Sequence, residues 1–234
     1  MMQVTTEIAA RNNAELCHAV LAAHAITATF VRDCWYSNTA LPELYPNLVT
    51  LSPGFDPEGL SFLTIDRAWA VKDSFATLDL APHGFTPIVE ASWLCHPGSG
   101  IDARKGEVIW EQVQSPATFG VWAALWGRDN PGLTRSPMTL RLLAQPALRL
   151  LAGKHDGRIV AGCIVNASPD VVGLSNLFHA ADAPADWLAT CLAFVAREYP
   201  DLPIVDYETD DDAALLLTHG FQRLGPLRIW LRSA

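Results

Sequence analysis

The alternation of hydrophobic and polar positions is clearest near the end of the chain, between Pro203 and Leu231. Residues 203–207 are a short, mainly apolar run with the length of a buried strand. Three aspartates at 210–212 follow, where negative charge stabilises the first turn of a helix. Gly220 suits the left-handed residue that ends a helix, and the apolar side chains after it alternate as in a strand. The pattern predicts a strand, a helix and a final strand.

The region upstream continues this alternation of strands and helices. The segment from Ile159 to Val165 is apolar at nearly every position, as expected for a central strand that is covered on both faces. We predict strands at 107–112, 148–152, 159–165 and 171–178, and helices at 115–126 and 183–197. The second half of the chain is therefore predicted to be an α+β unit with a mixed sheet.

The first half contains a tripeptide that occurs again near the end of the chain. His83-Gly84-Phe85 precedes Trp93-Leu94, and His219-Gly220-Phe221 precedes Trp230-Leu231. In both places an apolar strand comes before the tripeptide and a β-like run follows it. Chance similarity and an internal duplication both explain so short a match, and we favour duplication. We therefore divide the chain into a smaller unit at 1–97, a linker at 98–106 and a second unit at 107–234.

Composition places the chain among folded, acidic proteins. Of its 234 residues, 50% are hydrophobic and 18% are charged, so the chain can bury a large core and disorder is not expected. The net charge of −9 argues against nucleic acid or an anionic membrane as the main partner. Five scattered cysteines without a C-x-x-C pair favour a reducing compartment. Because the start of the chain has no apolar signal segment, we expect a cytoplasmic protein.

The predicted element order of the second unit is strand, helix, three-strand meander, helix, strand, helix, strand. This order, together with the Gly220-Phe221 exit from the last helix, resembles the GNAT acetyltransferase superfamily. The resemblance implies an acyl-CoA N-acyltransferase fold over 107–234 and a degenerate copy of it in 1–97, a tandem pseudo-repeat. The position that matches the family's frequent tyrosine, often a general acid, is Leu216 here.

The resemblance also implies a place for acetyl-CoA. In GNAT proteins two neighbouring strands splay apart, and the pantetheine arm lies in the gap against strand backbone. The corresponding positions in this chain are Asn176, Leu177 and Phe178. The pyrophosphate would face helix amides near Ala183 and Ala185, because free N–H groups and the helix dipole favour anions.

The loop before that helix departs from the family's glycine-rich pattern. It reads His-Ala-Ala-Asp-Ala-Pro-Ala-Asp at 179–186, without glycine or arginine. Asp182 and Asp186 would repel a pyrophosphate, and Pro184 removes one amide donor. We interpret Asp182 mainly as the residue that caps the helix.

Three side chains near the expected strand ends suit acid–base chemistry. Glu208 or His179 could deprotonate an ammonium substrate through a water molecule, and Tyr207 could protonate a leaving thiolate. The ordinary alternatives are packing for Tyr207 and solvation for Glu208. The carboxylates at 206–212 also match the oxygen ligands of a hard cation, but a charged helix start explains them better, and we predict no metal site.

Two hypotheses about function follow from the resemblance. The first is an N-acyltransferase that moves an acetyl group from acetyl-CoA to a small amine acceptor, by direct attack within a ternary complex. The second is a catalytically inactive GNAT-like module that binds a small molecule or a protein partner. The altered loop and the leucine at position 216 favour the second, whereas the intact strand order and the polar residues at the strand ends favour the first.

Overall fold

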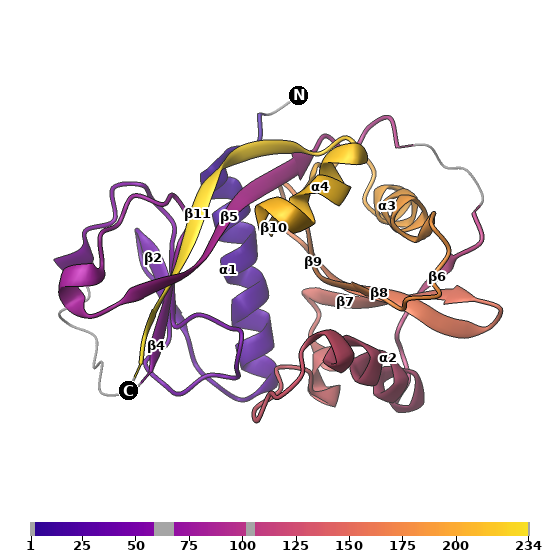
Figure 1. The fold of residues 1–234 in the computed structure, drawn as a ribbon, viewed down its shortest axis with the longest axis horizontal. Helices are drawn as coiled ribbons and strands as arrows, with labels where there is room; N and C mark the ends of the chain where they lie inside the picture. Colours follow the sequence, from indigo (N-terminus) through magenta and orange to yellow (C-terminus); the bar gives the residue numbers. More distant parts are fainter. Residues whose placement is uncertain (1–2, 59–67, 102–105, 234) are drawn as a thin grey trace.

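The computed structural model describes residues 3–58, 68–101 and 106–233. Its helices are α1 (Thr6–Ala23), α2 (Pro116–Asp129), α3 (Trp187–Glu198) and α4 (Asp210–Thr218), with short 3-10 segments at η2 (Ala81–His83) and η3 (Leu140–Ala144). The strands are β1 (Thr29–Phe30), β2 (Cys34–Tyr36), β3 (Leu48–Thr50), β4 (Trp69–Asp73), β5 (Thr86–His96), β6 (Ile109–Gln112), β7 (Leu148–His155), β8 (Arg158–Ala167), β9 (Val172–His179), β10 (Ile204–Glu208) and β11 (Gln222–Arg232). Figure 1 shows their arrangement.

All of these strands join one mixed sheet, in the order β1-β2-β3-β4-β11-β5-β10-β9-β8-β7-β6. The two halves of the chain are interleaved at the centre of the sheet. β5, from the first half, lies between the two C-terminal strands and pairs antiparallel with both β10 and β11 (Figure 1). β11 in turn pairs with β4 of the first half. The sheet is therefore continuous across both halves.

The strand pairs have the same sense on both sides of the central contact between β11 and β5. β4 and β10 are each antiparallel to a central strand and parallel to their outer neighbours, β3 and β9. Gly220 follows α4 with a left-handed φ angle of 90°, as predicted, and Gly84 follows η2 with a left-handed φ angle of 80°. The duplication stays a prediction, and so do the unit boundaries. Residues 102–105 of the predicted linker lie outside the described residues.

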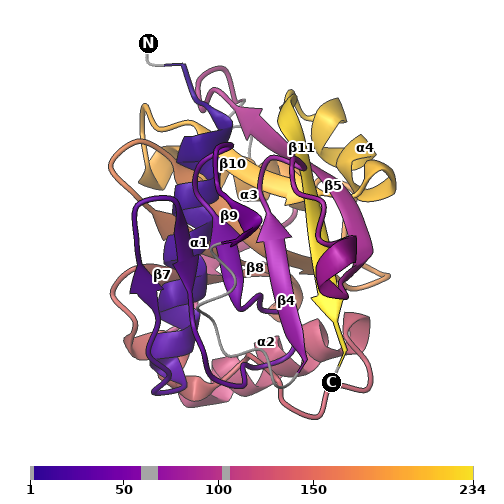
Figure 2. The same ribbon diagram turned by 90° about the vertical axis from the view of Figure 1, so that its left-hand side faces the viewer.

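Helices cover both faces of the sheet in the second half. α3 and α4 pack on one face, in a buried cluster with β6 to β10, and α1 and α2 pack with η3 on the other (Figure 1). α1 also contacts β2 and β3 of the first half through Ala14, Cys17 and Leu21. Figure 2 shows α1 and β4 from the side of the first half. The first helix therefore spans both halves of the molecule. Within the described residues, no helix has the length and apolar character needed to span a membrane.

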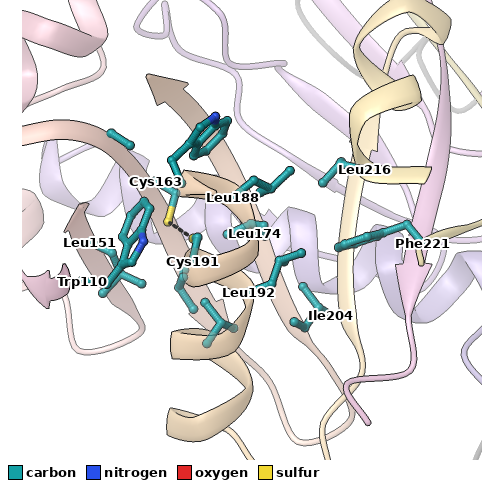
Figure 3. Close-up of a cluster of buried hydrophobic side chains, with 14 of the residues drawn as sticks. Trp110, Leu151, Cys163, Leu174, Leu188, Cys191, Leu192, Ile204, Leu216 and Phe221 are labelled. Atoms are coloured by element: carbon teal, nitrogen blue, oxygen red, sulfur yellow. Dashed lines mark hydrogen bonds between the residues drawn. The ribbon is translucent and has the colours of Figure 1, made fainter. Parts of the chain in front are cut away.

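β8 is the central strand of the second half, as its composition predicted. It lies between β7 and β9 and has seven consecutive buried residues, with Ile164 completely buried. On the α3 side of the sheet, Cys163 of β8 and Cys191 of α3 are both buried, with their sulfur atoms 3.8 Å apart and no disulfide between them (Figure 3). The residues around them belong to the buried apolar cluster drawn in Figure 3, so this side of the strand is core.

Candidate active site

β9 and β10 separate shortly after they begin to pair. Their parallel register joins Ile204 to Val172 and Val205 to Gly173, and the pairing ends there. β9 then carries a bulge, where Asn176 adopts a left-handed φ of 52° and the register with β8 shifts. A bulge bends its strand and increases the local twist. The backbone of residues 175–178 therefore has no β10 partner on its inner edge, as the sequence resemblance implied.

A cavity of about 250 Å³ lies at this separation of the strands. Both halves of the chain line it. On one side are α1, β4 and the loop before β3, and on the other side are α2, β9 and β10. Its lining residues are Asn13, Leu16, Cys17, Leu44, Tyr45, Pro46, Lys72, Trp126, Asn130, Ser175, Asn176, Leu177, Asp206, Tyr207 and Glu208. We call this space the central cavity.

Two carboxylates at the end of β10 line the central cavity. Asp206 is only 5% exposed, and burial raises the pKa of its carboxyl well above the usual range. One of its oxygens, Oδ1, accepts a hydrogen bond from the Tyr207 N–H at 2.7 Å, whereas Oδ2 is buried without a hydrogen-bond partner among the described residues. Burial, and then the nearby Asp212 carboxylate, raises the pKa of Glu208 to about 7. A carboxylate with that pKa can accept and release protons near neutral pH.

Lys72 of β4 brings a cation to the same cavity. Its side chain is almost fully buried, and Nζ donates a hydrogen bond to Asn13 Oδ1 of α1 at 2.8 Å. Nζ also lies 3.9 Å from the centre of the Tyr207 ring. The same ring meets Trp93 of β5 edge to face, with centroids 5.3 Å apart. Tyr207 of the second half therefore packs against two residues of the first half. We did not select Lys72 from the sequence, although a lysine directly after the apolar run 69–71 of a strand was a usable indication.

Hydrogen bonds between asparagines fix α1 against the sheet. The Asn12 side chain donates to the backbone carbonyl of Asn166, and the Asn166 side chain donates to that of Asn12. Gly173 of β9 makes room for this pair, because a Cβ there would stand 2.1 Å from Asn12 Oδ1. Asn13, the next residue along α1, is thereby placed at the cavity beside Lys72.

The loop before β3 closes another side of the central cavity. Glu43 Oε1 accepts hydrogen bonds from the Thr134 N–H and hydroxyl and from the Arg135 N–H, and these bonds lower the pKa of Glu43. Leu44 follows with a left-handed φ of 70°. The Tyr45 hydroxyl is buried close to the Asn176 side chain, without a hydrogen bond of good geometry. A loop of the first half is thus attached to a loop of the second half at the cavity.

The structure brings together some of the residues that we predicted from the sequence and separates others. Tyr207, Glu208, Asn176 and Leu177 line the central cavity. His179 lies at the far end of β9, where its ring stacks on Trp187 at 4.9 Å, and it is not among the lining residues described above. Their chemical roles stay predictions.

The Phe178 side chain points into the core rather than toward the cavity. Its ring meets Trp122 of α2 edge to face, with centroids 5.1 Å apart, and is 3% exposed. Only its backbone borders the separation of β9 and β10. Of the tryptophans on α2, Trp126 lines the cavity, whereas the Trp122 indole donates to the Leu151 carbonyl within the core.

The prediction that Asp182 caps the second-half helix is wrong. α3 begins at Trp187, and Asp182 instead forms an ion pair with Arg158 at 3.1 Å. Ala183 lies in a turn, where its N–H donates to the Ala180 carbonyl at 3.0 Å, and so it is not a free helix amide. The physical reason is Pro184, because a proline disfavours the helical conformation of the residue before it.

Asp186 occupies the N-cap position of α3 without capping the helix. Its side chain accepts a hydrogen bond from the Glu107 N–H at 2.9 Å, which ties the start of α3 to the segment before β6. Ala185 lies in the turn immediately before this position. The Asp186 carboxylate therefore accepts one backbone hydrogen bond, and its Oδ1 is buried without a partner among the described residues. The ion pair of Asp182 with Arg158 weakens the repulsion that we expected toward a pyrophosphate.

Leu216, at the position of the tyrosine found in many GNAT proteins, lies inside the core. It is 2% exposed and belongs to the same buried cluster as Leu188 of α3 (Figure 3). The three aspartates of α4 occupy its first turn, as predicted, with Asp210 paired to Arg223 at 2.9 Å. The described residues contain no group of three or more side chains suited to hold a metal ion.

Solved structures of similar shape include those of GCN5-related N-acetyltransferases. The structure of one from Kribbella flavida matches with a TM-score of 0.67 and 18% identity, over 97% of this chain and 96% of that chain. A Drosophila protein matches with a TM-score of 0.61 and 11% identity, over 97% and 89%. A GCN5-related N-acetyltransferase from Sphaerobacter thermophilus matches with a TM-score of 0.52 and 12% identity, over 74% and 62%.

No family model matches the sequence, and no curated protein matches it significantly. At these low identities the structural matches establish the fold alone. The chain has the GNAT fold, in a divergent form, as the resemblance in its sequence predicted.

Proposed function

We propose that this protein is an N-acyltransferase that transfers an acetyl group from acetyl-CoA to a small amine. The observation that carries the proposal is the separation of β9 from β10, with Glu208 at its edge and a pKa of about 7. A gap with unpaired strand backbone suits an extended thioester arm, and a carboxylate that titrates near neutral pH suits proton removal from an ammonium group. The fold supports the same assignment as an analogy only.

The residues around the gap fit acetyl-CoA, which would supply an activated thioester carbonyl. The backbone of Asn176, Leu177 and Phe178 offers hydrogen-bonding groups along the arm. The phosphates would lie toward Ala185 and the first turn of α3, where the helix dipole favours anions. Arg158 stands nearby and neutralises Asp182, so this end of the gap is less acidic than the sequence alone implies.

The proposed reaction is a direct displacement. Glu208 removes a proton from the acceptor ammonium, and the free amine nitrogen attacks the thioester carbon. The new C–N bond forms as the C–S bond breaks, and the nitrogen releases its surplus proton to solvent. The leaving thiolate takes a proton that Tyr207 provides and regains from solvent. The products are an N-acetyl amide, free CoA thiol and one net proton. His179 lies away from this centre, and we assign it no proton-transfer step.

Release of CoA thiol tests this proposal. The wild-type protein should release thiol from acetyl-CoA only when a primary amine is present, and kcat/KM should rise with pH through about 7. Glu208→Gln should lower kcat by about 10²–10⁴-fold and remove that pH dependence. Glu7→Gln, an exposed carboxylate on α1, serves as the control that removes the same charge. Thiol release that is independent of amine, or unaffected by Glu208→Gln, would contradict the proposed mechanism.

A catalytically inactive binding module is the second candidate. Two observations favour it: the apolar Leu216 in place of a proton-donating tyrosine, and the two aspartates before α3. It predicts that ligands bind without turnover. The same thiol assay, combined with calorimetry, separates the two candidates.

We also propose a reducing compartment, the cytoplasm, as the location of the protein. All five cysteines are free thiols, and the sulfur atoms of Cys163 and Cys191 stay unbonded although they lie 3.8 Å apart. A pair so close and so deeply buried is compatible with a compartment that keeps thiols reduced.

A further inference from the structure

We infer that the acceptor is a small amino acid or a close analogue, with a carboxylate beside its amine, and that Lys72 of the first half binds this carboxylate. The inference rests on the proposed function and specifies the substrate class of the same cavity. It is drawn from a buried lysine and a buried carboxyl group that line the central cavity with unsatisfied bonding capacity.

The first of these groups is the Lys72 ammonium. Among the described residues, Asn13 Oδ1 is the one hydrogen-bond acceptor of Nζ, and no carboxylate forms an ion pair with it. The Tyr207 ring covers another side of the ammonium. Lysine is almost never fully buried unless it is paired, because an isolated buried charge is costly. A buried cation that borders a cavity and has N–H donors to spare is suited to an anionic group of a ligand.

The second group is the Asp206 carboxylate. It lines the same cavity, is nine-tenths or more buried, and has one oxygen, Oδ2, without a hydrogen-bond partner among the described residues. Lys72 does not satisfy this oxygen directly, since the two groups form no ion pair. Glu208 adds a second acidic group at the edge of the strand separation. Donors on a ligand, such as the N–H groups of an ammonium, suit these oxygens.

The positions of the two groups give the acceptor an orientation. Asp206 and Glu208 lie on β10, next to the gap that we assign to the thioester. Lys72 lies on β4, on the first-half side of the cavity, together with the buried Tyr45 hydroxyl. The amine of the acceptor would thus face the thioester, and its carboxylate would face the first half of the chain.

The size of the cavity sets a limit on the acceptor. Its volume of about 250 Å³ lies below the roughly 300–1,000 Å³ of pockets that hold drug-sized ligands. The space suits a small acceptor such as a free amino acid.

A comparison of matched acceptors tests the inference on the wild-type protein. The probes are leucine against 3-methylbutylamine, phenylalanine against phenethylamine and histidine against histamine, each at the same concentration of free amine. For at least one pair, kcat/KM with acetyl-CoA should be about tenfold or more higher for the amino acid, as expected for a charge-assisted hydrogen bond. Equal or lower kcat/KM for the amino acid in every pair would overturn the inference.

Variants then assign the preference to Lys72. Lys72→Met should lower kcat/KM for the amino acid about tenfold or more beyond any loss toward the matched amine. Lys154→Met, which removes the same charge from a half-exposed position paired with Glu111, should keep the preference. Circular dichroism checks that each variant is folded. An equal loss toward both acceptors would contradict a role in carboxylate binding.

Direct binding separates failure of this inference from failure of the proposed function. If no acceptor is acetylated and acetyl-CoA does not bind, the acyltransferase proposal fails. The inference is then judged by calorimetry of the same six compounds with the wild-type protein. Binding of an amino acid about tenfold or more tighter than its amine would support it, and absence of that difference would overturn it.

Discussion

The side-chain amides of Asn12 and Asn166 each donate a hydrogen bond to the backbone carbonyl of the other residue, at 3.1 and 2.9 Å. One residue belongs to α1 of the first half and the other to β8 of the second half, and both are buried. Because a buried amide without partners is costly, the pair fixes both the position and the rotation of α1. This relationship places Asn13 at the central cavity, where it accepts a hydrogen bond from Lys72 of β4.

Removal of one amide of this pair should destabilise the whole protein. Asn166→Ala should lower the free energy of unfolding by about 1–3 kcal/mol, because it leaves the Asn12 carbonyl without its side-chain donor. Asn38→Ala, at an exposed position, is the control and should change the free energy of unfolding by less than about 0.5 kcal/mol. Urea unfolding measures this free energy for both variants. If Asn12→Ala and Asn166→Ala simply add in the double variant, the two side chains do not act as a coupled pair.

The central position of β8 gives a second prediction. Ile164→Ala should cost about 2–5 kcal/mol, because it leaves a cavity between α1, α2 and the sheet. Ile109→Ala, on the edge strand β6 and 71% exposed, makes the same truncation where no cavity forms. It should cost less than about 0.5 kcal/mol. A cost below about 1 kcal/mol for Ile164→Ala would be inconsistent with a strand buried on both faces.

Much of the fold could be predicted from local pattern. The apolar run at 159–165, the turn at 155–157 and the acidic start of α4 each follow from rules that act over a few residues, and the structure has β8, a hairpin and α4 at these places. The start of α3 was mispredicted because two aspartates compete for one cap. Pro184 decides between them, since it excludes helix before it.

The candidate site could be predicted only in part, because half of it comes from distant segments. Tyr207, Glu208, Asn176 and Leu177 lie near strand ends, where a family resemblance alone points to them. Lys72, which meets Asn13 across a sequence separation of 59 residues, has no local pattern that reveals its partner. Interleaving of β5 between β10 and β11 likewise depends on pairings between the halves that hydrophobic periodicity does not encode.

The raised pKa of Glu208 predicts a dependence of stability on pH. The folded state holds this proton up to about pH 7, whereas an unfolded carboxyl loses it near pH 4.5, so wild-type stability falls as pH rises between these values. Glu208→Gln carries no proton to lose. The free energy of unfolding of this variant, relative to that of the wild type, should therefore rise by about 2 kcal/mol between pH 5 and pH 8. Thermal unfolding at several pH values measures the difference.

Asp212→Asn is the matched variant for that experiment. It removes the neighbouring charge that also raises the pKa of Glu208, so the stability of this variant should fall less steeply with pH than that of the wild type. A constant difference between Glu208→Gln and the wild type from pH 5 to pH 8 would show that burial does not hold a proton on Glu208.

The charges before α3 predict how CoA affinity responds to substitution. Asp182→Asn removes the carboxylate that pairs with Arg158, and the released guanidinium can meet a phosphate. CoA should bind about twofold to fivefold tighter, and the gain should shrink at high salt because screening weakens it. Asp186→Asn keeps an oxygen for the Glu107 N–H and should act in the same direction.

Asp201→Asn is the control for these two variants. It removes the same charge from an exposed position beyond the opposite end of α3, and asparagine tolerates the left-handed φ of 68° found there. Calorimetry with CoA should give it the wild-type affinity. Equal tightening by all three substitutions would indicate an effect of net charge rather than a phosphate site at the start of α3.

Hydrogen–deuterium exchange with and without CoA tests the central claim most directly, because it locates the ligand on the backbone of the unmodified protein. The account predicts slower exchange in peptides that cover residues 175–178 and 185–190 when CoA is present, and unchanged exchange in β2 of the first half. It also predicts that acetyl-CoA gives the same protection as CoA. Unchanged exchange at 175–178 under saturating CoA would contradict a binding site between β9 and β10.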